Sequence, residues 1–300
     1  MEYNNNWLSY HIFCHNYSIH DKIICKLTNW AIEENIKDYF FIRYWEGGPH
    51  IRFRIKKNDY LKDYYKIALQ NLLSEELENN VVSITKEQYY RGNKLDGKKI
   101  PIQELPWFDN NSIISIDYIR ENDRYGGKEF IEEAENLFNK SSILVFLLLK
   151  EHNNCKLTIR VFFYLYIYKA VIEKIEYNEL DFDQMQFYTT CFKYWKTLYE
   201  LENTSYITNL TNSISNSFDS NIENINKVFM FISKSKVEEF SKPLIIYLKK
   251  VGYLKGKKMM RSVLFSQMHM FANRLGIPIE YECGIYGYLK KTDNLFNRGK

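Results

Sequence analysis

Two arginines and a histidine alternate along a strand-like segment, and their types suit the binding of an anion. The segment FFIRYWEGGPHIRFRI covers residues 40–55. Its Glu-Gly-Gly-Pro stretch lies between two apolar runs and is typical of the turn of a β-hairpin. Because strand side chains alternate, His50, Arg52 and Arg54 share one face, and the apolar residues between them face the core. Guanidinium groups stay charged and bind a carboxylate, a phosphate or an enolate oxygen through paired hydrogen bonds. The structural alternative is a solvated face, or arginines paired with neighbouring acids.

A second segment, YIRENDRYGG at residues 118–127, combines an acid, a base and two glycines. Glu121 and Arg124 are three residues apart at the end of a strand-like run, so a local ion pair can orient the arginine. The two glycines let the backbone approach a ligand closely. The alternative is a turn with solvated charges.

A third segment, residues 262–276, is a predicted helix with one polar stripe. Ser262, Ser266, His269 and Asn273 lie at helical spacing on a helix otherwise rich in Met, Phe and Leu. A histidine titrates near neutral pH, so His269 is a candidate general acid or base. The alternative is a hydrogen-bonded structural histidine. Gly276 is typical of a helix C-cap.

The elements that position these residues follow an α+β order. Residues 7–14, 39–45, 50–55 and 81–90 have strand patterns, and residues 21–36 and 60–77 have helical periodicity. This order of strand, helix, strand, strand, helix, strand predicts a ferredoxin-like arrangement, with residues 113–120 as a further strand.

Beyond residue 126 the pattern becomes helical. Helices are predicted over residues 128–138, 142–152, 158–175, 183–201, 227–240, 243–253 and 257–275, and a mobile surface loop over 202–226. The sequence therefore predicts an α+β class, with a ferredoxin-like part at 1–125 packed on a mostly helical part at 126–300.

Composition excludes several classes of function. The formal net charge of +4 is too small to indicate nucleic-acid binding, and no apolar run is long enough to span a bilayer. The five cysteines are scattered without a CxxC pair, which predicts no disulfide framework, no zinc site and a cytoplasmic protein. Phosphate-loop, GxGxxG, HExxH and GxSxG motifs are missing from the sequence, so no metal or cofactor is predicted.

The order and the amino-acid sequences of four segments resemble those of one known family. WLSYHIF, RYWEGGPHIRFRI, YIRENDRYGG and HMFANRLGI follow one another between about Trp7 and Gly276. Together they resemble the elimination domain of class I lanthipeptide dehydratases, which is the carboxy-terminal half of the nisin-type enzyme. The same unit also occurs as a separate dehydratase subunit in thiopeptide pathways.

The resemblance implies an activity and a set of residues. In that family a separate domain uses glutamyl-tRNA to esterify Ser or Thr of a precursor peptide, and the elimination domain then removes glutamate to leave dehydroalanine or dehydrobutyrine. The matching catalytic positions are Arg52, Arg54, Glu121, Arg124 and His269, which are expected to converge on one pocket. The matching segments also predict substrate contacts from His50, Tyr125, Ser266, Asn273 and Arg274.

The resemblance leaves two alternatives and implies two partners. Some members of the family join two dehydroalanines by aza-cycloaddition to form the pyridine of a thiopeptide, and a non-catalytic member would only bind the peptide as a scaffold. The expected partners are a ribosomally made precursor peptide and a separate glutamyl-tRNA-dependent glutamylating subunit, because little sequence precedes Trp7. Asn139, Lys140 and Ser141 stand where many relatives have an acidic residue before the serine.

Overall fold

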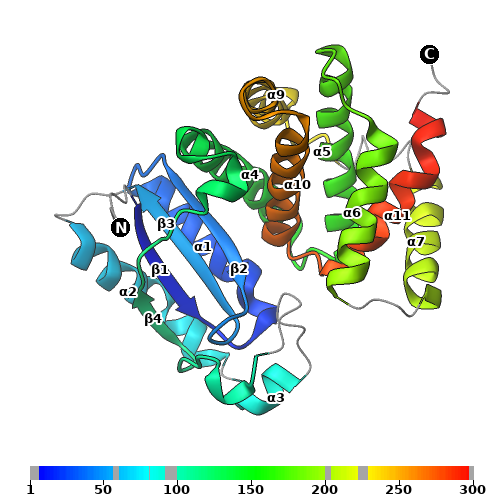
Figure 1. The fold of residues 1–300 in the computed structure, drawn as a ribbon. Helices are drawn as coiled ribbons and strands as arrows, with labels where there is room; N and C mark the ends of the chain where they lie inside the picture. The colour runs from blue at the N-terminus through cyan, green and yellow to red at the C-terminus, as the bar shows by residue number, and fades with distance from the viewer. Residues whose placement is uncertain are drawn as a thin grey trace. The chain divides into compact units, whose positions relative to one another are not determined.

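Four short strands form the sheet that carries the arginine segment (Figure 1). They are β1 (Trp7–Phe13), β2 (Tyr39–Tyr44), β3 (His50–Lys56) and β4 (Ser112–Ser115). Their order is β2-β3-β1-β4, with every neighbouring pair antiparallel. Helices α1 (His20–Glu33) and α2 (Lys62–Asn79) complete the ferredoxin-like order that the sequence predicts. The α+β class is confirmed.

The computed structural model describes residues 7–56, 61–80, 82–91, 100–199, 204–221 and 229–296. These residues belong to two compact units. The first unit is Met1–Glu121 with Phe138–Asn154, and the second is Asn122–Leu137 with Cys155–Lys300. The predicted boundary after residue 125 stays a prediction.

The two faces of the sheet differ as the alternation in β3 predicts. Ile51, Phe53 and Ile55 are fully buried, and Trp30 of α1 packs on the Phe53 ring. Fully burying one such apolar side chain stabilises the fold by roughly 1.5–3 kcal/mol. The core of the first unit therefore fixes the register of β3, and this register places His50, Arg52 and Arg54 together on the other face.

The turn between β2 and β3 is anchored rather than free. Gly47 has a φ of 92°, and its backbone N–H donates to the Tyr90 hydroxyl at 2.7 Å. That hydroxyl in turn donates to the Pro106 carbonyl at 2.8 Å. A Cβ atom on Gly47 would lie 2.7 Å from the Phe108 ring. Both the backbone conformation and the neighbouring ring therefore require glycine at this position.

Gly47→Ala is expected to lower the free energy of unfolding by about 2–4 kcal/mol, because backbone strain and overpacking add. Gly256→Ala is the matched control, since Gly256 also has a positive φ of 86° but nothing lies within 4 Å of a Cβ there. That control should lose only about 1 kcal/mol. Urea denaturation of the two variants measures the difference, and equal losses would contradict a role for Phe108.

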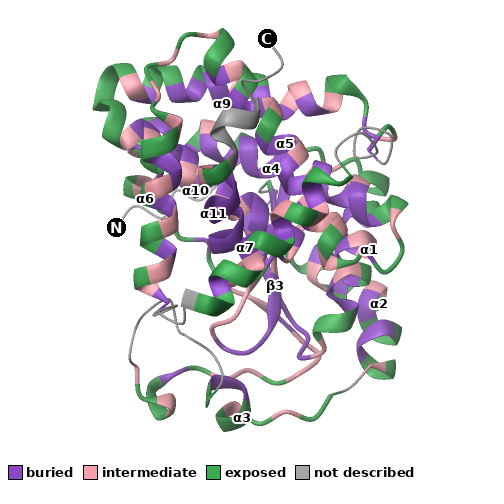
Figure 2. Cartoon of the chain, turned by 90° about the vertical axis from the view of Figure 1, so that its right-hand side faces the viewer, coloured by how far each residue is buried: buried purple, intermediate pink, exposed green. Residues whose placement is uncertain are grey.

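The second unit is helical. Its helices within the described residues are α5 (Leu157–Tyr177), α6 (Gln184–Leu198), α7 (Thr204–Asp219), α9 (Lys234–Lys255), α10 (Lys257–Leu275) and α11 (Ile279–Phe296). Helix α4 (Ile131–Glu151) begins in this unit and ends in the first. In Figure 2 much of α11 is purple, in agreement with the burial of every residue from 282 to 289. Gly276 ends α10 in the left-handed conformation, which confirms the predicted C-cap.

The strand predicted over residues 81–90 is wrong. Lys86–Arg91 form a short helix, α3, while Val81 lies outside the described residues. Thr85 and Gln88 exchange hydrogen bonds between their side chains and backbone N–H groups, at 3.2 and 2.9 Å. This reciprocal capping box starts a helix where the residue types alone favoured a strand. The fourth strand of the sheet is instead β4, which covers only the start of the predicted 113–120 strand.

The loop predicted over residues 202–226 is also wrong where it is described. Helix α7 occupies most of it, and Ile207, Ile214 and Phe218 are buried at helical spacing among many polar residues. Residues 202–203 and 222–226 lie outside the described residues.

Beyond residue 126 the helices differ from the prediction in three further ways. The helices predicted at 128–138 and 142–152 are one continuous helix, α4. Those predicted at 227–240 and 243–253 are likewise one helix, α9, which begins at Lys234 and has Pro243 inside it. Residues 229–233 are not helical, and residues 227–228 lie outside the described part. Helix α11 was not predicted.

Candidate active site

Arg52 and Arg54 are held against aromatic rings on the polar face of the sheet. The Cζ atom of Arg52 lies 3.4 Å from the centroid of the Tyr44 ring. The Cζ atom of Arg54 lies 4.2 Å from the Tyr118 ring centroid, and this side chain is almost fully buried. Stacking fixes the plane of a guanidinium and leaves its edge able to bind an oxyanion. The aromatic rings therefore hold both guanidinium groups in fixed orientations.

His50 contacts Arg52 and fixes it further. The Nδ1 atom of His50 lies 2.8 Å from the Gly48 carbonyl, and Nε2 lies 3.2 Å from Arg52 Nε. An arginine only donates, so Nε2 accepts from Arg52 and the proton of a neutral His50 sits on Nδ1. His11 stacks on His50 with ring centroids 5.0 Å apart. Both imidazoles are buried.

These two histidines predict a pH dependence of stability. Burial lowers the pKa of His50 from 6.5 to about 3 and that of His11 to about 2. Between about pH 4 and pH 6 the unfolded chain therefore binds protons that the folded chain does not, and stability falls as the pH falls. One such proton contributes a slope of about 1.4 kcal/mol per pH unit.

His50→Asn is expected to remove the contribution of about one proton from this slope, or about 1.4 kcal/mol per pH unit. The Asn amide nitrogen can still donate a hydrogen bond to the Gly48 carbonyl. Urea unfolding of both proteins at several values between about pH 4 and pH 6 measures the difference. A parallel pH dependence of the two proteins would contradict a neutral, buried His50.

Glu121 is the last residue of the first segment of the first unit, and it is exposed. Burial lowers the pKa of Arg52, and the negative charges of Glu46 and Glu121 act in the opposite direction. The negative charge of Glu121 thus favours the charged form of one of the predicted catalytic cations.

In the second unit, Arg124 and Ser266 are brought together although they are far apart in the sequence. Arg124 lies in a short 3-10 helix, η4 (Asn122–Tyr125), and its Nε donates to the Ser266 hydroxyl at 3.4 Å. The Tyr125 carbonyl accepts from the Tyr247 hydroxyl at 2.6 Å, which anchors the same turn. Two of the predicted residues in this unit are therefore neighbours.

His269 has a buried acidic partner that the sequence analysis missed. Its Nδ1 atom lies 2.9 Å from Glu282 Oε2, and the imidazole is partly exposed. The other carboxylate oxygen, Oε1, accepts from Trp195 Nε1 at 3.0 Å, and Glu282 is completely buried. The Trp195 ring also packs on the imidazole, with centroids 4.8 Å apart. Recognising α11 as a helix would have placed Glu282 on its buried side.

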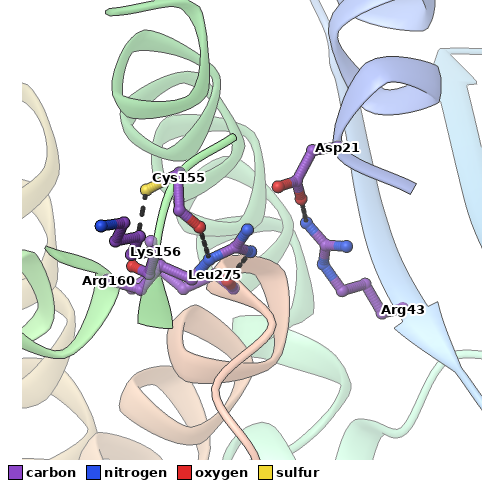
Figure 3. A network of polar contacts seen from close by, with 6 residues as sticks. All are labelled: Asp21, Arg43, Cys155, Lys156, Arg160 and Leu275. Carbon is purple, nitrogen blue, oxygen red and sulfur yellow. Dashed lines mark hydrogen bonds and ion pairs between the residues drawn. The ribbon is translucent and has the colours of Figure 1, made fainter. Parts of the chain in front are cut away.

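Arg274 and Asn273 lie at the end of α10. Arg274 is 1% exposed, and its Nη1 donates to the Met270 carbonyl at 2.8 Å. Substrate contact by Arg274 stays a prediction. Arg160 contacts the same helix end: it donates hydrogen bonds to the carbonyls of Leu275 at 2.7 Å and Cys155 at 2.9 Å (Figure 3).

The predicted residues thus fall into two sets. His50, Arg52, Arg54 and Glu121 belong to the first unit, and Arg124, Tyr125, Ser266, His269, Asn273 and Arg274 belong to the second. The convergence of both sets on one substrate stays a prediction. Within the part of the chain that the structure describes, no three His, Cys, Asp or Glu residues are grouped so as to hold a metal ion. No helix among the same residues is long and apolar enough to cross a bilayer.

A family model covers nearly the whole chain. Residues 7–292 match the model described as the lantibiotic biosynthesis dehydratase C-terminal region. The chain therefore belongs to this family, as the resemblance of its segments predicts. No curated protein matches the sequence.

Several solved structures share the fold, among them the following three. The chain superposes on the pyridine synthase TbtD from thiomuracin biosynthesis with a TM-score of 0.67 and 14% identity, covering 98% of this chain and 99% of TbtD. For the tRNA-dependent lantibiotic dehydratase MibB from Microbispora sp. 107891, the TM-score is 0.55 at 15% identity, over 99% of this chain and 29% of MibB. For TsrL the values are 0.54 and 12%, over 96% of this chain and 94% of TsrL. At these identities the similarity shows a shared fold.

Proposed function

We propose that the protein eliminates glutamate from glutamylated Ser or Thr residues of a ribosomally made precursor peptide. A base removes the Cα proton, the Cα=Cβ bond forms, and the Cβ–O bond breaks. The electron pair of that bond leaves with the glutamate carboxylate. The products are free glutamate and a dehydroalanine or dehydrobutyrine residue, and the balance of atoms needs no further reactant.

The observation that carries the proposal is the pair of oriented cations, Arg52 and Arg54, on one face of the sheet. The substrate carries a free glutamyl carboxylate, and negative charge develops on the carbonyl oxygen next to Cα as the proton leaves. Fixed guanidinium groups stabilise both charges without reorganising during the reaction. His269 supplies the group that exchanges a proton with the substrate.

The proposal has a direct test. The purified protein is incubated with a synthetic precursor peptide that bears a glutamyl ester on one serine, and the mass of the peptide is followed. Loss of glutamate with formation of the alkene supports elimination. An unchanged ester, under conditions in which the peptide binds, contradicts it and favours a peptide-binding scaffold.

Aza-cycloaddition of two dehydroalanines is the second candidate. The observation that favours it is the name of TbtD, a pyridine synthase whose fold matches almost the whole of both chains. A peptide that already carries two dehydroalanines distinguishes the candidates. Formation of a cyclised product or expulsion of the leader peptide from this substrate supports cycloaddition, whereas a protein that only eliminates leaves it unchanged.

A further inference from the structure

The carboxylate of Glu282 is hydrogen-bonded on both oxygens by side chains from two other helices. Trp195 of α6 donates to Oε1 at 3.0 Å, and His269 of α10 lies 2.9 Å from Oε2. Glu282 is 0% exposed. Within the described residues His269 is the only cation-forming side chain in an ion pair with it. A carboxylate this deeply buried is costly unless its partners are well placed.

The hydrogen bonds decide which nitrogen of His269 carries the proton. An ionised carboxylate only accepts hydrogen bonds, so Nδ1 of a neutral His269 must donate to Glu282. The lone pair of the imidazole is then on Nε2, and this nitrogen points away from the carboxylate. When Nε2 takes up a proton, the charge that appears on the ring is stabilised by the adjacent carboxylate.

We infer that Glu282 is a positioning residue that makes Nε2 of His269 the atom that accepts the Cα proton of the peptide substrate. This inference rests on the proposed function, because elimination requires a base at Cα. The leaving glutamate departs as a carboxylate, the conjugate base of an acid with a pKa of about 4, and so it needs no proton. The structure thus assigns the histidine to the base side of the reaction.

Glu282→Gln gives the most specific test. A glutamine has one accepting oxygen and one donating amino group, so it cannot accept from both Trp195 and His269. The indole N–H of Trp195 can only donate, whereas His269 can move its proton to the other nitrogen. The amide oxygen therefore turns to Trp195, the amide nitrogen turns to His269, and His269 becomes protonated on Nε2.

Two readouts measure this change. Nitrogen NMR of ¹⁵N-histidine-labelled protein should show the Nδ1–H tautomer of His269 in the unaltered protein and the Nε2–H tautomer in Glu282→Gln. The signals are assigned by their loss in His269→Asn. The rate of glutamate loss, kcat, should fall about a hundredfold in Glu282→Gln, with KM within about threefold, because the base is blocked and substrate binding is not.

A double variant provides the rescue. In Trp195→Phe with Glu282→Gln the indole donor is gone, so the amide oxygen is free to accept from Nδ1 of His269. This double variant should regain the Nδ1–H tautomer, and its kcat should be at least about tenfold higher than that of Glu282→Gln. Trp195→Phe alone should keep the tautomer of the unaltered protein.

The outcomes separate the inference from the proposed function. An Nε2–H tautomer in the unaltered protein overturns the inference without any variant, and so does a Glu282→Gln protein whose tautomer and kcat are both unchanged. A tautomer that switches as expected in a protein that never eliminates glutamate overturns the proposed function instead, and leaves Nε2 assigned as the basic atom.

Discussion

His269→Asn is expected to slow glutamate elimination about a thousandfold, within the range that a positioned general base contributes. The Asn amide nitrogen takes the place of Nδ1 and can still donate to the buried carboxylate of Glu282. The substitution therefore removes Nε2 without leaving the carboxylate unpartnered, and a loss of rate is not a consequence of misfolding. Single-turnover measurement of glutamate release gives the rate of the chemical step.

His152→Asn is the matched control for this variant. His152 lies near the end of α4, and no role in the reaction is assigned to it. Its rate of elimination should equal that of the unaltered protein. A loss below about tenfold in His269→Asn would show that another group removes the Cα proton.

Arg52→Lys is expected to lower kcat/KM for glutamate elimination about a hundredfold although the positive charge is kept. A lysine cannot donate to His50 in the place of Arg52 Nε, and it has no planar group to stack on Tyr44. The ammonium is therefore free to move, and it cannot bind a carboxylate through paired hydrogen bonds. The free energy of unfolding should fall by only about 1 kcal/mol.

Arg43→Lys on the opposite face of the same sheet is the control. Arg43 forms an ion pair with Asp21 at 2.6 Å (Figure 3), and a lysine keeps this pair. Its kcat/KM should be unchanged, while its stability changes by an amount similar to that of Arg52→Lys. Equal losses of activity in both variants would mean that general weakening of the sheet, and not the position of Arg52, limits the reaction.

Patterns with a fixed local period were predicted well from the sequence. The alternation in β3 placed His50, Arg52 and Arg54 on one face, and the first five elements of the ferredoxin-like order were predicted correctly, whereas the predicted fourth strand at 81–90 was wrong. Where composition and the spacing of apolar residues indicated different structures, the prediction from composition was wrong. In α7 the apolar residues Ile207 and Ile214 repeat at helical intervals, but the many Asn and Ser residues between them suggested a loop.

Contacts across long separations could not be predicted in this way. Helical and strand periods relate residues two to four positions apart, whereas Trp195 and Glu282 are separated by 87 residues. Their hydrogen bond depends on the packing of α6 against α11, and α11 itself was not predicted. The acidic partner of His269 was therefore missed, because no local pattern in the sequence connects Glu282 with His269.

The anchored turn between β2 and β3 limits how this protein can evolve or be engineered. Hairpin tips usually tolerate insertions, because nothing packs against them. Here the tip is held by Tyr90 and closed over by Phe108, and Tyr44 pairs with His50 across it. One additional residue would either break this anchor or shift β3 by one position and exchange its two faces. Changes in length among descendants of this sequence should therefore accumulate in other loops, and the spacing from Tyr44 to Arg54 should stay constant.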